Sequence, residues 1–357
     1  MSHTVQIDYS SKGEKCLAIC EQIDAQIASV ENALSQIDAI PEQDIAPESV
    51  KYLESVRQKI VSWANTSEVG KNLAEEIKQN PIVRKEYGSY NGRDSRLADL
   101  GAIEDSFHKD SSLITATLQA IALDSEANGI NRRSKIVWDN PDARFEEYLS
   151  SIKDENKRQF IYLAHCSNPD MNVEQLEVEA QRMLDIACGK VLEKETSRRV
   201  EDMRAAGVDD DVIEKALTTN ESSSPIDRLT ELYDKTSGVI VDEKVRRKVL
   251  QFIKKTITAK GFIIAQGNIK KRGDVVTMLA QKPGGETAIF TVYLDGKFVY
   301  DFKGYEGQAC QQDIEPFLKD LEEVYGVELS NRREIWRNPD RLLSQKKQTI
   351  KENSNTK

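Results

Sequence analysis

Apolar side chains form a regular stripe along residues 11–40. They recur at alternating spacings of four and three positions, which makes an unbroken heptad seam. Such a seam is narrower than the core face of an ordinary helix, so we expect one or two further helices to pack along it. The sequence leaves open whether those helices belong to this chain or to a partner. The stripe begins at Cys16 and Cys20, and we predict that it binds a partner through Ile23, Ile27, Val30, Leu34 and Ile37.

The same helical period continues through the first two thirds of the chain. A Pro-containing turn leads to a predicted helix over 48–79, and a third helix covers about 94–126. Long helices joined by a short turn favour an antiparallel hairpin, so residues 1–128 are expected to form a long-helix coiled-coil bundle. Residues 129–237 are predicted as a helical domain, with helices over 140–164, 172–206, 209–218 and 225–235.

After a predicted helix over 241–260, the hydrophobic period changes to that of strands. Four apolar runs, at 262–266, 275–281, 287–294 and 297–302, are separated by turn sequences that include the hairpin signal Asp295-Gly296. We predict a four-stranded antiparallel meander packed on helices, with a further helix over 308–325. The sequence therefore indicates a mainly α, elongated protein with an α+β domain over 238–330. Residues 331–357 are expected to form a terminal helix and a disordered basic tail.

One short sequence occurs twice, around Trp138 and Trp336. Each tryptophan follows an Asn-Arg-Arg triplet and lies two residues before the asparagine of an Asn-Pro-Asp helix start. One interpretation is a hydrophobic staple, in which each ring packs back on the helix that it precedes. The other is a pair of equivalent docking edges for a partner.

The composition fits long, exposed helices. Charged residues are 31% of the chain and hydrophobic residues 39%, with only 18 glycines and 9 prolines. No apolar stretch is long enough to span a bilayer, and the N-terminus has no apolar signal-peptide core. Five sparse cysteines do not make a disulfide framework, so we expect a reducing compartment, no contact with a membrane and a cytoplasmic location.

Charge is distributed unevenly along the chain. Residues 1–128 carry a net charge of −9 and residues 129–237 of −7, whereas residues 331–357 carry +5. Between residues 244 and 272 there are ten basic side chains and no acidic one. This run indicates a solvated helix face, a surface for acidic helices, or a phosphate-binding surface. Under the third interpretation the contacts are Arg247, Lys248, Lys255, Lys270, Lys271 and Arg272.

Nothing in the sequence identifies a catalytic or metal-binding motif. Cys16 and Cys20 lie on the seam and are expected to be core thiols, and the neighbours His165 and Cys166 point about 100° apart on a helix. No phosphate-binding glycine motif is present. We therefore predict no catalytic residues, no metal and no cofactor.

A family resemblance rests on the segment from Tyr300 to Cys310, with its Gly-Tyr-Glu-Gly-Gln-Ala-Cys turn, and on the helix that ends at Tyr325-Gly326-Val327. Residues 241–330 resemble small uncharacterised bacterial proteins that are encoded beside AAA+ ATPases of the MoxR type. The resemblance implies an accessory role in a multi-component bacterial system, with such an ATPase as a possible partner.

Taken together, these features predict a non-enzymatic interaction or scaffold protein that binds a protein partner or itself through the seam. Two alternatives are a nucleic-acid-binding protein that uses the basic run and an enzyme whose residues are scattered along the chain. The acidic first two thirds would repel nucleic acid, so we do not expect nucleic acid to be the partner.

Overall fold

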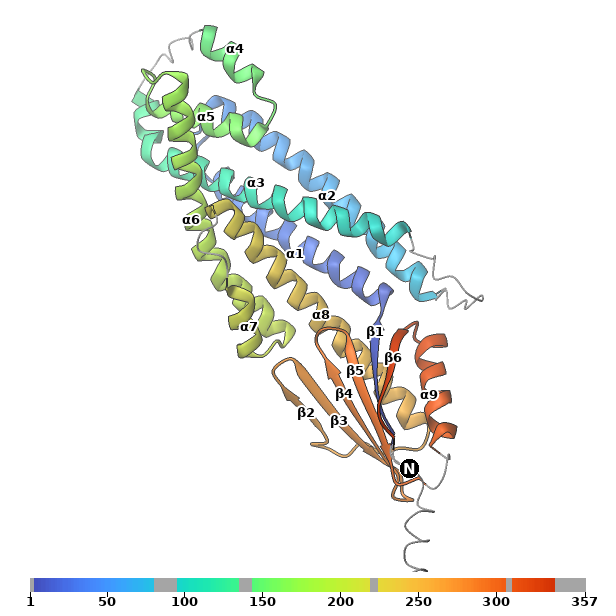
Figure 1. Ribbon diagram of the computed structural model, residues 1–357. Coiled ribbons are helices and arrows are strands. Elements are labelled where there is room, and N and C mark those ends of the chain that lie inside the picture. Colours follow the sequence, from blue (N-terminus) through green and yellow to red (C-terminus); the bar gives the residue numbers. More distant parts are fainter. Residues whose placement is uncertain (1–2, 80–94, 135–142, 219–223, 306–309, 338–357) are drawn as a thin grey trace, which may run out of the picture.

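The computed structural model describes residues 3–79, 95–134, 143–218, 224–305 and 310–337. Long helices lie side by side and an antiparallel sheet lies at one end of them (Figure 1). The predicted fold class, mainly α with an α+β part built largely from the C-terminal third, is confirmed. In the described part of the chain, no helix is long and apolar enough to cross a membrane.

The helices are bounded as follows: α1 Lys12–Asp38, the short 3₁₀ helix η1 Glu42–Asp44, α2 Pro47–Gln79, α3 Ser95–Ser134, α4 Ala143–Ser151, α5 Glu155–Ser167, α6 Val173–Ala206, α7 Asp210–Leu217, α8 Pro225–Ala259 and α9 Gln311–Glu323.

Local capping chemistry explains several of these bounds. Asn172 and Gln175 form the predicted capping box at the start of α6, and Gly207 ends that helix with a left-handed φ of 80°. Ser224 caps α8, and its Pro225 occupies the first turn, where no backbone donor is needed.

Two helix predictions are wrong in their continuity. The helix predicted over 140–164 is broken, because Asp154 accepts a hydrogen bond from the Lys157 backbone and starts α5 as a separate helix. Conversely, the helices predicted over 225–235 and 241–260 are the single helix α8. A glycine inside a helix costs about 1 kcal/mol, and the buried neighbours Ser237 and Ile240 of α8 show that tertiary packing continues through Gly238 and offsets that cost.

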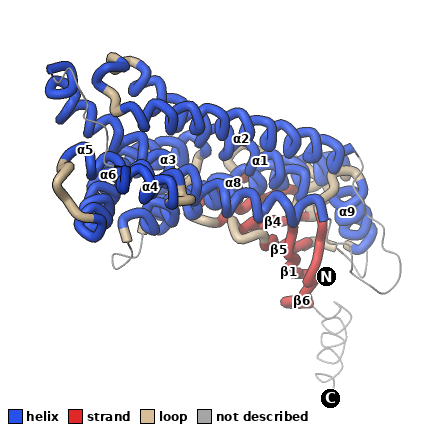
Figure 2. Tube along the Cα trace, turned by 90° about the horizontal axis from the view of Figure 1, so that it is seen from above, coloured by secondary structure: helices blue, strands red, loops and turns tan. Residues whose placement is uncertain are grey.

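Helix α1 is the central helix of the bundle and packs against α2, α3 and α8 (Figures 1 and 2). It runs antiparallel to α2, since Cys16 near its start contacts Gly70, and Asp38 at its end pairs with Arg57. The seam of α1 is therefore enclosed by helices of the same chain.

The sheet has six strands, in the order β2-β3-β4-β5-β1-β6. Strands β2 to β5 form an antiparallel meander, and the N-terminal strand β1 lies between β5 and β6, antiparallel to both. Their bounds are β1 His3–Ser10, β2 Ile269–Arg272, β3 Val275–Gln281, β4 Thr287–Tyr293, β5 Lys297–Lys303 and β6 Glu328–Arg337.

The prediction of a four-stranded sheet is corrected in three places. The run at 262–266 forms only an isolated bridge, from Ile263 to Gln281, and the first strand of the meander is β2 instead. β1 was not predicted, although Val5 and Ile7 alternate with polar residues and are buried. Residues 331–337, which were assigned to the terminal segment, lie in β6, whereas the terminal helix predicted after Asn338-Pro339-Asp340 and the predicted tail lie outside the described residues.

One face of the sheet is buried against α8 and α9. Met278, Phe290 and Phe302 are fully buried on that face, and the ring of Phe290 lies 5.1 Å from that of Phe317 on α9. A single hydrophobic core connects this layer with the helical bundle, from Val5 to Val327. The domain boundaries predicted at 128/129 and 237/238 both fall inside helices, α3 and α8.

Candidate functional site

The seam residues that were predicted to bind a partner are covered by the chain itself. Their exposed fractions range from 0% to 6%. Because they belong to the main hydrophobic core, they stabilise the bundle and leave no surface there for another protein. They are Ile23, Ile27, Val30, Leu34 and Ile37.

The repeated tryptophan segments do not form a matched pair of described helix starts. Trp138 lies outside the described residues. Trp336 lies in β6, where its backbone is in register with Thr4 of β1, so that this segment is a strand and not the approach to a helix.

The basic run between residues 244 and 272 is divided between two different environments. Lys271 points to the helical side of the sheet, where its Nζ lies 3.1 Å from Glu243 and 3.2 Å from Asp209. Arg247 donates to the same Glu243 carboxylate at 3.0 Å. Lys271 therefore links the sheet to α8 and to the α6–α7 turn, whereas the Arg247 pair lies within α8, and both cations already have a carboxylate partner.

The remaining predicted contacts do not share one surface. Lys270 and Arg272 are exposed and pair in register with Thr277 and Val275, on the sheet face that points away from α8. Lys248 and Lys255 are exposed on α8 itself. The predicted nucleic-acid surface is thus split between the two sides of the sheet layer.

The sheet face that points away from α8 is the candidate protein interface. In an antiparallel sheet with one buried face, the second face usually points towards water and carries polar side chains. Here the register places Leu279 opposite Ile289, and Thr291 opposite Val299, in the middle of the face. The partly exposed side chains of this open face include the acidic Asp301, in register with Ile289, together with Val275, Thr277, Leu279, Ile289, Thr291, Tyr293 and Val299.

Both edges of the sheet carry features that discourage strand addition. β2 is only four residues long and bears Lys270, Lys271 and Arg272. β6 is irregular against β1, with register shifts at Thr4/Val5 and Gln6/Asp8. Short, charged and bulged edges are the usual protection against pairing with another chain, so docking is favoured on the open face rather than at an edge.

The segment that carries the family resemblance is fixed by a small polar cluster. The Tyr305 hydroxyl donates to Asp313 Oδ2 at 2.6 Å, and Lys282 Nζ contacts the same oxygen at 2.6 Å. Burial, followed by the hydrogen bond to Asp313, raises the pKa of Tyr305 above its usual value. The cluster joins the β3–β4 turn to the start of α9. Residues 306–309 of the motif lie outside the described residues.

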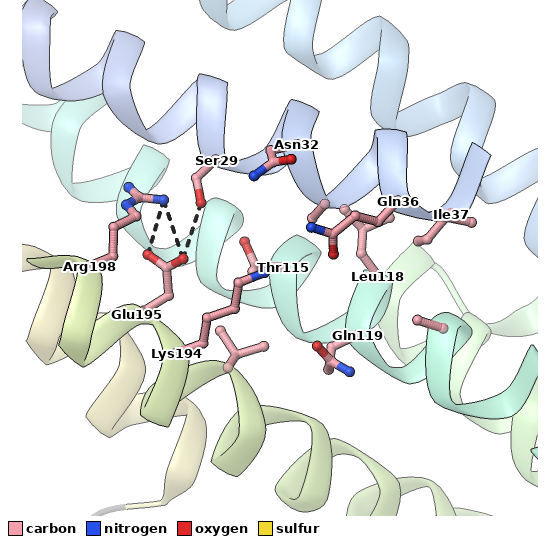
Figure 3. Close-up of a pocket in the computed structure, with 13 residues that line it drawn as sticks. Ser29, Asn32, Gln36, Ile37, Thr115, Leu118, Gln119, Lys194, Glu195 and Arg198 are labelled. Carbon is pink, nitrogen blue, oxygen red and sulfur yellow. Dashed lines mark hydrogen bonds and ion pairs between the residues drawn. The ribbon is translucent and has the colours of Figure 1, made fainter. Parts of the chain in front are cut away.

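A polar cleft lies between α1, α3 and α6, with a volume of about 80 Å³ (Figure 3). At one end, Glu195 Oε1 accepts hydrogen bonds from Ser29 Oγ at 3.2 Å and from Arg198 Nη1 at 3.3 Å. Only 3% of Glu195 is exposed. The rest of the lining combines apolar side chains with amides, a hydroxyl and a lysine: Asn32, Ala33, Gln36, Ile37, Thr115, Leu118, Gln119, Ala122, Val191 and Lys194.

A buried polar layer continues from the cleft into the bundle. Arg199, which is fully buried, donates to Gln26 Oε1 at 2.5 Å and to Gln22 Oε1 at 3.4 Å. Its guanidinium also lies 5.0 Å from the centre of the Tyr233 ring. Burial, and then the charge of Arg198, lower the pKa of Arg199.

Neither the cleft nor this buried polar layer was predicted from the sequence. The signal was the row of polar residues Gln22, Gln26 and Ser29, each one position before a seam residue. Such a row resembles the solvated flank of a coiled coil, and only the packing of α6 shows that it is covered.

Cys16 and Cys20 occupy the buried positions expected of core thiols, at 1% and 0% exposure. In the described part of the chain, no group of three or more His, Cys, Asp or Glu side chains is arranged to hold a metal ion.

Comparison with known proteins gives no relative: no family model matches the chain, and no curated protein matches it.

Proposed function

We propose that this protein is a non-enzymatic interaction or scaffold protein that binds a protein partner through the open face of its sheet. The observation that carries the proposal is the composition of that face. Leu279, Ile289 and Val299 stand partly exposed in the centre of three adjacent strands, where solvent-facing positions are normally polar. Exposed apolar groups gathered on one face favour a protein contact.

Charge defines the kind of partner that fits. Lys270 and Arg272 border the open face along β2, so the complementary surface has an apolar centre and acidic side chains at its margin. The resemblance of residues 241–330 supports one candidate, a MoxR-type AAA+ ATPase from the same genome, which would make this chain its accessory subunit.

The test is calorimetric titration of the full chain with that purified ATPase. Ile289→Arg places a charge in the centre of the face and is expected to weaken binding at least tenfold, which corresponds to about 1.4 kcal/mol. The matched control is Val178→Arg, because Val178 is 72% exposed on α6, far from the sheet in sequence and structure. Equal binding by both variants would remove the open face as the interface, and no binding by the wild type would remove this ATPase as the partner.

A second experiment tests the main alternative function, nucleic-acid binding. Fluorescence anisotropy with duplex DNA and single-stranded RNA near physiological salt is expected to show no binding tighter than the usual non-specific range of about 10⁻⁴ to 10⁻⁶ M. Tighter binding that is lost in the double variant Lys270→Ser, Arg272→Ser would replace the protein partner with nucleic acid.

A further inference from the structure

The cleft between α1, α3 and α6 is lined by the Glu195 carboxylate, by its ion-pair partner Arg198 and by a second cation, Lys194. Glu195 Oε2 is buried and lies 3.3 Å from Arg198 Nη1, yet it accepts no hydrogen bond from the described residues. A buried carboxylate oxygen without a donor is costly, so it favours a donor supplied by a ligand.

Lys194 supplies the complementary charge. It lines the same cleft, is exposed, and forms no ion pair with any residue that the structure describes. Lys194 and Glu195 are neighbours on α6, and successive side chains on a helix point about 100° apart, so they do not neutralise each other directly. Figure 3 shows the Lys194 side chain extending towards Thr115 while the Glu195 carboxylate turns towards Ser29.

The size of the cleft limits what can bind. One water molecule needs roughly 10–15 Å³ of such space, so about 80 Å³ accepts around half a dozen non-hydrogen atoms. Drug-sized molecules occupy cavities of about 300 Å³ or more and are too large. The floor is apolar at Ile37, Leu118 and Val191, each of which is buried, so one small apolar group is also accommodated.

We propose that this cleft binds a small zwitterion, an α-amino acid of about the size of alanine. Its ammonium group donates to Glu195 Oε2, its carboxylate contacts Lys194, and its side chain rests on the apolar floor. The amides of Asn32, Gln36 and Gln119 line the wall and offer further donors and acceptors. This site is separate from the open face of the sheet, so the experiment below tests it independently of the proposed protein interface.

The experiment is isothermal titration of the full chain with L-alanine, propionate and ethylamine. Propionate keeps the carboxylate and lacks the ammonium group, whereas ethylamine keeps the ammonium group and lacks the carboxylate. We expect saturable binding of alanine and at least tenfold weaker binding of either analogue, since each loses one charge-assisted contact. Absence of saturable heat with alanine, or equal affinity for alanine and one analogue, would overturn the proposal.

Three variants locate the site. Glu195→Gln retains the shape and an oxygen for Ser29, and is expected to weaken alanine binding about tenfold or more. Lys194→Met, at an exposed position, is expected to weaken it about three- to fivefold. The control is Lys190→Met, one turn earlier on α6, exposed and outside the cleft, which should bind as the wild type does. If Lys194→Met binds as tightly as Lys190→Met, the cleft is not the binding site, and this readout holds even if Glu195→Gln fails to fold.

Discussion

Replacing Glu243 with Gln removes the charge on which three cations converge at the junction of sheet and helices. Glu243 is 2% exposed, and Arg246, its closest partner, is 1% exposed. Arg247 Nε lies 3.0 Å away and Lys271 Nζ 3.1 Å away from the same carboxylate. The substitution therefore leaves Arg246 as a buried cation without a carboxylate.

The expected loss follows mainly from Arg246. Removing one partner of a buried ion pair typically costs about 3–5 kcal/mol, because the remaining charge stays desolvated. Arg246 Nε and Nη1 already have no hydrogen-bond partner among the described residues, so no local group takes over. Arg247 is half exposed, and its pair adds at most about 1 kcal/mol. We expect a total near 3–5 kcal/mol, a large part of the stability of an ordinary domain.

Urea unfolding followed by far-UV circular dichroism measures this loss. With a denaturant slope of about 3 kcal/mol/M, the midpoint should fall by roughly 1 M or more. The matched control is Glu21→Gln, whose pair with Lys244 at 2.5 Å is partly exposed and should cost less than about 1 kcal/mol. A midpoint for Glu243→Gln within error of the Glu21→Gln value would refute the assignment of this network to stability.

Three other substitutions or modifications follow from the same structure. Lys271→Met should lower the urea midpoint because its contacts to Glu243 are lost, whereas the exposed Lys270→Met should change stability by less than about 0.5 kcal/mol; equal effects would contradict the split of the basic run. Ile27→Asp should destabilise the bundle by several kcal/mol, about 3–5, through burial of a charge, and a wild-type melting temperature would disprove its burial. Cys16 and Cys20 should react with a thiol reagent only after unfolding in urea, and fast reaction of the native protein would contradict their core position.

Much of the fold could be predicted because its signals are local. The heptad seam, the capping box at Asn172 and the Asp295-Gly296 turn are each defined by residues only a few positions apart, and all three elements have the predicted type. What could not be predicted depends on pairing across the whole chain. β1 consists of eight residues whose alternation is weak by itself, and it becomes a strand because β5 and β6 supply backbone partners on both sides.

The candidate sites show the same division. The sequence predicted that the α1 seam is covered either by helices of this chain or by a partner. It did not predict which helices cover it. To predict the open face of the sheet, one needs the alternation of buried and exposed residues in β3 to β5. One also needs to know that α8 and α9 cover the opposite face, which the alternation does not give. The cleft depends on the contact between Glu195 of α6 and Ser29 of α1. These two residues are 166 positions apart in the sequence, so no local pattern predicts that they meet.

The basic run illustrates why an unopposed charge pattern in sequence does not establish an unopposed surface. From residue 244 to 272 no acidic side chain occurs, yet half of the ten cations have carboxylate partners that lie outside the run. Lys244 reaches back to Glu21, and Lys260 reaches forward to Asp320 at 2.7 Å, so the run connects the two ends of the chain. The paired cations are Lys244, Arg246, Arg247, Lys260 and Lys271. The acidic side chains of the helices therefore pair with these cations within the chain and stabilise its fold. Within the run, the cations that lie next to the open face are Lys270 and Arg272 on β2, which is why the interface we propose has positive charge along that strand.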